Sequence, residues 1–202
     1  AGYGVSGKEN VALGTSTGMR VVGMANVAVG SEAGNDTDGE GNAAIGMAAG
    51  QTVTGSHNMA VGSSAGRFVG GDANFAAGRS SGNDVLGSDN VAIGVASGVL
   101  VRGNENTAVG SAAGSEVIGD SNAAFGRVAG LRIEGYSNSA LGDSAGIDIR
   151  GNENAAFGAY SGGRVTGDYN VAMGSSAGTD VEGSNNFAGG TGSGFRVQGY
   201  DN

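Results

Sequence analysis

The block GSDNVAIGVASGVLVR, residues 87–102, is followed directly by GNENTAVGSAAGSEVI, residues 103–118, and then by GDSNAAFGRVAGLRIE, residues 119–134. Each block has sixteen residues, and the same letters return at the same places. We number these places 1 to 16 starting from Gly87, and the frame then runs through the whole chain without an insertion or deletion. An internal repeat of this regularity predicts a solenoid in which every repeat forms one coil.

Several places in the frame hold nearly constant residue types. Positions 1, 8 and 12 are always Gly, position 4 is always Asn, and position 6 is always Ala. Position 11 is only Ala, Ser or Thr, and position 15 is always Val, Ile or Thr. The three Gly positions hold 38 of the 44 glycines, so the glycines mark turns, and a flexible linker is a poor interpretation of this composition.

Two stretches of strand length, at positions 4 to 8 and 13 to 16, are bounded by these constant residues, and no stretch shows the periodicity of a helix. We therefore predict an all-β fold, a parallel β-roll (solenoid) of sixteen-residue coils with two short strands per coil and about 4.8 Å between coils. Residues 1–202 would form one head-repeat domain of about twelve and a half coils. The turn glycines would supply positive φ or close backbone approach, and the Asn side chains would bond neighbouring backbone or stack as an amide ladder.

The second strand has the pattern of a half-buried strand. Its β-branched position 15 should point inward, and positions 14 and 16, which are mainly polar or charged, should face water. The charges at position 14 alternate in sign from coil to coil, which favours pairing between neighbouring strands. The alternating residues are Glu116, Arg132, Asp148, Arg164, Asp180 and Arg196.

The first strand is apolar on both sides. The constant Ala, with Asn, should face the narrow interior opposite position 15, and positions 5 and 7, mostly Val, Ile, Leu, Met or Phe, should point outward. In the alternative arrangement the two sides of this strand are exchanged, and the Ala side packs against another copy of the chain. Wherever Phe occupies position 5 or 7, the other of these two positions in the same coil holds Ala or Gly. The pairs are Phe75 with Ala77, Ala123 with Phe125, Ala155 with Phe157, and Phe187 with Gly189.

One chain alone would expose this apolar stripe to water, and the stripe is larger than the apolar patches usual on soluble monomers. We therefore predict a parallel homo-oligomer that buries the stripe on its axis. The predicted interface residues are Val91, Ile93, Val109, Phe125, Leu141, Phe157, Val171 and Met173.

Composition argues against several partners. The formal net charge is −9 and the ten Lys and Arg are scattered singly, so neither nucleic acid nor an anionic lipid surface is an expected partner. No apolar run reaches the length of roughly 20 residues that crosses a bilayer, so we expect no membrane insertion by this chain. The absence of Cys excludes disulfides and thiol chemistry.

No constellation for catalysis is visible, and we predict neither an enzyme nor a cofactor or metal site. The one His, His57, lies in a turn without a nucleophile or base that the sequence places beside it. The acidic residues Asp36, Asp38 and Glu40 faintly resemble a Ca²⁺ loop, but Met47 stands where the bidentate Glu is required. Hexapeptide-repeat acyltransferases do not fit a sixteen-residue coil, and ice binding would favour a constant outward Thr, which is missing.

A ligand-binding residue cannot be chosen from the sequence. We expect any ligand site to use positions 14 and 16 and the turn at positions 2 and 3, where residue identity varies freely. Phe68 and Leu100, both at position 14, are exposed apolar candidates, although an isolated surface hydrophobe is the plainer interpretation.

The phrases NVAIG (residues 90–94), NTAVG (106–110) and NVAMG (170–174) resemble the NSVAIG-type head repeats of YadA-like trimeric autotransporter adhesins. The resemblance covers essentially the whole chain. Two departures stand out: sixteen residues is longer than the common head repeat, and Asn stands where the family usually has Ser, as in GSDNVAIG. The resemblance implies a left-handed β-roll with three chains packed side by side.

The same resemblance implies a function. The chain would be an excised adhesin head of a longer protein, displayed on the bacterial cell surface and anchored in the outer membrane through C-terminal regions outside this sequence. Its partners would be its own copies in a homotrimer and host cell-surface or extracellular-matrix components such as collagen, fibronectin or laminin. The alternative is a structural spacer rod that has no ligand of its own.

Overall fold

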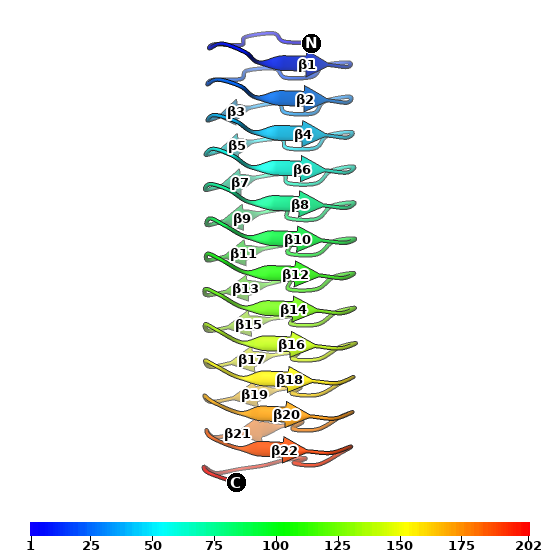
Figure 1. The fold of residues 1–202 in the computed structure, drawn as a ribbon, viewed down its shortest axis with the longest axis vertical. Coiled ribbons are helices and arrows are strands. Elements are labelled where there is room, and N and C mark those ends of the chain that lie inside the picture. Colours follow the sequence, from blue (N-terminus) through cyan, green and yellow to red (C-terminus); the bar gives the residue numbers. More distant parts are fainter. The chain divides into compact units, whose positions relative to one another are not determined.

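The computed structural model describes all 202 residues, which fall into two compact units, residues 1–101 and residues 102–202. Each unit is a parallel β-solenoid of sixteen-residue coils with two short strands per coil and no helix, so the predicted fold class is confirmed. Within each unit, strands of the same kind lie one above another (Figure 1). No helix long and apolar enough to span a membrane is present.

In the first unit the longer strands pair in the order β1-β2-β4-β6-β8-β10, and the shorter ones in the order β3-β5-β7-β9. The longer strands are β1 (Val11–Leu13), β2 (Val27–Val29), β4 (Ala43–Ile45), β6 (Met59–Val61), β8 (Phe75–Ala77) and β10 (Val91–Ile93). The shorter strands are β3 (Thr37–Asp38), β5 (Val53–Thr54), β7 (Val69–Gly70) and β9 (Val85–Leu86). Strand β11 (Val101–Arg102) lies where the second unit begins.

The second unit repeats this arrangement, with β12-β14-β16-β18-β20-β22 in one sheet and β13-β15-β17-β19-β21 in the other. The longer strands are β12 (Thr107–Val109), β14 (Ala123–Phe125), β16 (Ser139–Leu141), β18 (Ala155–Phe157), β20 (Val171–Met173) and β22 (Phe187–Gly189). The shorter strands are β13 (Val117–Ile118), β15 (Ile133–Glu134), β17 (Ile149–Arg150), β19 (Val165–Thr166) and β21 (Val181–Glu182). Pairing joins residues sixteen apart, as in Ala124 with Ala140, so each position stacks on its own equivalent.

The strands are shorter than the sequence predicts: they occupy positions 5 to 7 and 15 to 16 instead of 4 to 8 and 13 to 16. The cause is a left-handed residue at position 14, such as Arg132 with φ 60°, which breaks the extended backbone before position 15. Positions 3 and 10 adopt the same conformation, as at Glu153 with φ 55° and Val128 with φ 59°. These three bends, together with the glycines, close each coil in sixteen residues.

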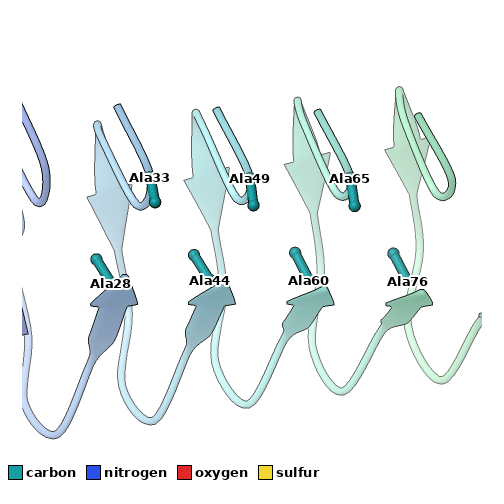
Figure 2. Packing of buried hydrophobic residues seen from close by; sticks show 7 residues of the cluster. All are labelled: Ala28, Ala33, Ala44, Ala49, Ala60, Ala65 and Ala76. Carbon is teal, nitrogen blue, oxygen red and sulfur yellow. The ribbon is translucent and has the colours of Figure 1, made fainter. Parts of the chain in front are cut away.

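The interior of each coil is narrow and filled by small side chains. Ala28, Ala44, Ala60 and Ala76 project from β2, β4, β6 and β8 toward Ala33, Ala49 and Ala65 on the turn opposite, and the cluster is buried (Figure 2). The second unit has the equivalent alanine cluster, closed by Ile133 and Ile149, which are both 0% exposed. The prediction that the constant Ala faces inward opposite position 15 is therefore confirmed, and the swapped arrangement is wrong.

The Asn residues at position 4 form the predicted amide ladder. Asn138 is 0% exposed, and its side-chain Nδ2 donates to Asn122 Oδ1 at 3.0 Å and to the carbonyl of Gly151 at 2.9 Å. Its Oδ1 accepts from both the backbone N and the Nδ2 of Asn154, each at 3.0 Å. Every polar atom of the amide is paired, which is what a buried amide requires.

Candidate functional site

The outward side of the longer strands forms an uncovered apolar surface in each unit. We call the side chains at positions 5 and 7 the apolar face; none of them is charged. They point away from the alanine-filled interior because successive side chains of a strand alternate between its two sides. In the second unit Phe125 is 39% exposed, Phe157 38% and Met173 48%, so the single chain leaves these side chains in contact with water.

All eight predicted interface residues lie on the apolar face of their unit. Val91 and Ile93 belong to β10 in the first unit, and the other six belong to β12, β14, β16, β18 and β20 in the second. Ile93 and Leu141 are exposed like the two Phe, and the three valines are half-buried. Within the second unit, pairing in register aligns one side chain from each coil into a continuous row: Val109, Phe125, Leu141, Phe157 and Met173.

The opposite side of the coils is a charged face, made by positions 14 and 16. The predicted pairing of alternating charges is confirmed there: Arg132 Nη2 donates to Asp148 Oδ2 at 2.8 Å, and Arg164 Nη2 donates to Asp180 Oδ2 at 2.6 Å. The hydrogen bond from the arginine lowers the pKa of Asp148, and likewise the pKa of Asp180. These pairs are solvent-exposed, so they support the register of the coils more than they add stability.

The lowered pKa values predict a dependence of stability on acid. A carboxyl whose pKa is depressed by folding stabilises the native state above its unfolded pKa, about 3.9, and this contribution is lost as the pH falls through the folded value. Replacing both Asp148 and Asp180 by Asn should therefore reduce the loss of stability between pH 6 and pH 3. Urea unfolding at both pH values measures this, and high salt should shrink the effect. An acid dependence identical to that of the unmodified chain would contradict the role of these pairs.

The turn at positions 2 and 3 is an acidic edge. In the second unit it carries five carboxylates and no Lys or Arg; the carboxylates are Glu105, Asp120, Glu153, Asp168 and Asp201. In the first unit it carries four carboxylates with Lys8 and His57. The negative charge of Glu153 raises the pKa of the neighbouring Tyr169, because it disfavours the ionised phenol. Most of the net charge of −9 therefore lies along this edge.

The structure does not assemble a catalytic or metal centre from the residues singled out in the sequence. His57 is exposed at a left-handed position with φ 60°. Asp36 forms an ion pair with Arg20, and it does not join Asp38 and Glu40 in a ligand set. No group of three or more His, Asp or Glu side chains is placed to hold a metal ion.

Phe68 and Leu100 are exposed on the charged face of the first unit, at 47% and 43%, as the sequence predicts. The guanidinium of Arg67 lies 5.2 Å from the centroid of the Phe68 ring. Leu86, at position 16 of the same face, is 55% exposed and was not among the predicted apolar candidates. The sequence pattern does indicate this exposure: Val85 at position 15 points inward, so the next residue of the strand, Leu86, points outward.

Comparisons with protein-family models, with curated proteins and with solved structures found no match to this chain. A functional assignment therefore depends on the repeat motif and on the surfaces described above.

Proposed function

We propose that this chain is part of the head of a bacterial surface adhesin of the YadA-like trimeric autotransporter type. The repeat motif supports the proposal, and the uncovered apolar face is the observation that carries it. The interior of each coil is already full, so the side chains of this face cannot be buried by rearrangement within the coil. Another surface has to cover them.

Copies of the same chain are the covering surface that we propose. Burying the exposed part of one large side chain of this face contributes on the order of 1 kcal/mol, and every coil offers at least one. Association through the apolar face removes no ionised group from water, whereas association through the charged face would carry that desolvation penalty. The number of copies, three, comes from the resemblance.

The remaining surfaces would then be displayed outward. The charged face and the acidic edge vary in sequence from coil to coil, while the ladder and the interior hold them on a rigid scaffold. Three copies would present each contact three times, so multivalent binding can offset weak single contacts with host cells or matrix proteins. Anchoring in the outer membrane would come from regions outside this sequence.

A spacer rod is the second candidate, and one observation favours it. The hollow on the charged face of the second unit is lined by residues of both signs, and its arginines are already paired with its carboxylates. Such a surface offers a ligand few free charges. The lining residues are Glu116, Ile118, Arg132, Glu134, Asp148 and Arg150.

Self-association gives the first test. Sedimentation or light scattering of the isolated chain should report a mass near three chains. Phe125→Glu should shift the mass to that of one chain, because an unpaired charge buried between copies costs several kcal/mol. Ile118→Glu is the matched control, since it is 52% exposed on the charged face, where Glu134 and Glu182 occupy the same position. A folded monomer of the unmodified chain would remove the proposal.

Solid-phase binding separates the adhesin from the spacer. The isolated oligomer should bind immobilised collagen, fibronectin, laminin or host cells, and monomeric Phe125→Glu should bind much more weakly through loss of multivalency. An oligomer that binds none of these surfaces would favour the spacer.

A further inference from the structure

Three large apolar side chains are exposed on the charged face of the first unit, in three successive coils. They are Phe68, Leu86 and Leu100. In the second unit the same face exposes one such side chain, Ile118. A cluster of exposed apolar side chains on a mainly polar face is typical of an interaction surface.

The stacking of the coils holds these three side chains together. Strands β7 and β9 pair in register, so Leu86 lies beside Gly70, and its Cδ2 is 3.1 Å from the place of a Cβ added to Gly70. Leu86 therefore extends over β7, the strand that directly follows Phe68. Phe68 and Leu100 share the left-handed backbone, with φ 58° and 61°, so their side chains leave the stack in the same direction.

Asp84 lies between Phe68 and Leu100 in the same column of position 14, with φ 57°. Its amide donates to the carbonyl of Arg67 at 2.9 Å, which fixes it in the stack. Its carboxylate is exposed and has no ion pair or hydrogen bond. Arg67 borders the patch, but its guanidinium lies on the Phe68 ring, 5.2 Å from the centroid, and makes no ion pair with Asp84.

The other carboxylates of position 14 have different neighbours. Each has an arginine beside it in the column, and three of them form ion pairs there: Asp36, Asp148 and Asp180. Asp84 instead has an apolar side chain on either side. It therefore presents an uncompensated negative charge in the middle of an apolar patch.

We infer that Phe68, Asp84, Leu86 and Leu100 form a docking patch for a protein segment that presents a Lys or Arg between apolar side chains. The aliphatic stem of Lys or Arg packs along apolar side chains while its charged head remains at their edge, where the Asp84 carboxylate accepts its hydrogen bonds. The apolar neighbours of that cation cover Phe68 and Leu86. The inference rests on the proposed function, in which the charged face is displayed outward, and it names the chemistry of the partner.

The charge of Asp84 decides between possible occupants. A purely apolar segment, or one that carries a carboxylate, would bury this charge without a partner, and that desolvation is costly. A cationic segment without apolar neighbours would leave the three hydrophobic side chains in water. The net charge of −9 also favours the approach of a cationic partner.

Three dye-labelled synthetic peptides test the chemistry. The first has a Lys flanked by Leu and Phe, the second has Glu in place of that Lys, and the third has the Lys flanked by Ser. Fluorescence anisotropy with the isolated unmodified chain should show that the first binds about tenfold more tightly than the other two, which corresponds to about 1.4 kcal/mol. No binding of the first peptide, or equal binding of the first and second, would overturn the inference.

Two substitutions locate the binding. Leu86→Thr should weaken binding of the first peptide about tenfold, and the coil should fold because Thr occupies the same position in Thr54 and Thr166. Asp84→Asn keeps the shape of the side chain and removes its charge, so the preference for the first peptide over the second should disappear. Circular dichroism checks that both variants remain folded.

Two matched controls lie outside the patch. Ile118→Thr removes an exposed apolar side chain from the same face, and Asp89→Asn removes one negative charge at position 3, where Asn occurs naturally as Asn185. Both controls should bind the first peptide like the unmodified chain, and a loss equal to that of the patch variants would overturn the inference. Failure of the proposed function appears separately, as a monomeric mass of the unmodified chain, because the patch lies within one unit of a single chain.

Discussion

Gly39→Ala should lower the free energy of unfolding by roughly 4 kcal/mol or more, among the largest effects available to a single substitution in this chain. Gly39 occupies position 1 with φ 150°, and a Cβ there would lie 1.9 Å from the carbonyl oxygen of Gly55 in the next coil. That coil cannot simply move away, because the Gly55 amide donates to the Asp38 carbonyl at 2.8 Å. Urea unfolding followed by far-ultraviolet circular dichroism measures the loss.

Gly41→Ala is the matched control, two residues along the same turn. Gly41 also has a positive φ, 66°, but an added Cβ would meet only the exposed side chain of His57, at 3.2 Å. Ala already stands at the same position in Ala25 and Ala73, with φ 56° at both. We expect a loss of only about 1–2 kcal/mol, the cost of the left-handed conformation for a residue with a Cβ. Equal losses for the two substitutions would show that coil-to-coil contact is not the reason for the constant glycine.

Asn138→Asp should destabilise the chain by roughly 3–5 kcal/mol at neutral pH. The change removes both side-chain donors, so a carboxylate oxygen would face Asn122 Oδ1 and the carbonyl of Gly151 in a fully buried site. Burial and the two facing oxygens would raise the pKa of the new carboxyl. A raised pKa makes stability fall as the pH rises above the unfolded value of about 3.9, so the variant should be less impaired at pH 4 than at pH 7.

Asn185→Asp makes the same chemical change at an exposed turn residue. Asn185 lies at position 3 with φ 59°, where Asp occurs naturally as Asp89 and Asp201 with nearly the same φ. Its stability at both pH values should match that of the unmodified chain. If Asn138→Asp were as mild as Asn185→Asp, the ladder would not be a source of stability.

The period, the amide ladder and the alternating charges could be predicted because every coil has nearly the same surroundings, whereas for the constant Ala the sequence favoured the inward side and left the swapped arrangement open. In a stack of equivalent coils, each residue lies next to the residue sixteen places away in the sequence. Residues at the same repeat position, such as Asn122, Asn138 and Asn154, are therefore expected to contact one another. The candidate interface followed from the same columns, since the strand alternation places positions 5 and 7 opposite the small, constant Ala.

The strand ends could not be predicted in this way. Phe68, Leu100 and Val128 adopt the left-handed conformation, which their side chains disfavour, so residue type carried no signal. Their conformation is imposed by the stack: the amide of Val128 donates to the Ser111 carbonyl at 2.8 Å, and equivalent bonds recur coil after coil. Many such hydrogen bonds together outweigh a local preference of about 1–2 kcal/mol per residue.

The sequence by itself determined the sixteen-residue coil and the residue types that each place in it tolerates, because these depend on contacts that repeat at a constant spacing. Only the tertiary structure decided which of the two sides of the first strand stays uncovered. The reason is the width of the coil: the turn glycines and left-handed residues bring the two sheets so close that only small side chains, the Asn of the ladder and one β-branched residue per coil fit between them. The larger side chains of positions 5 and 7 are therefore left outside, where a second surface can cover them.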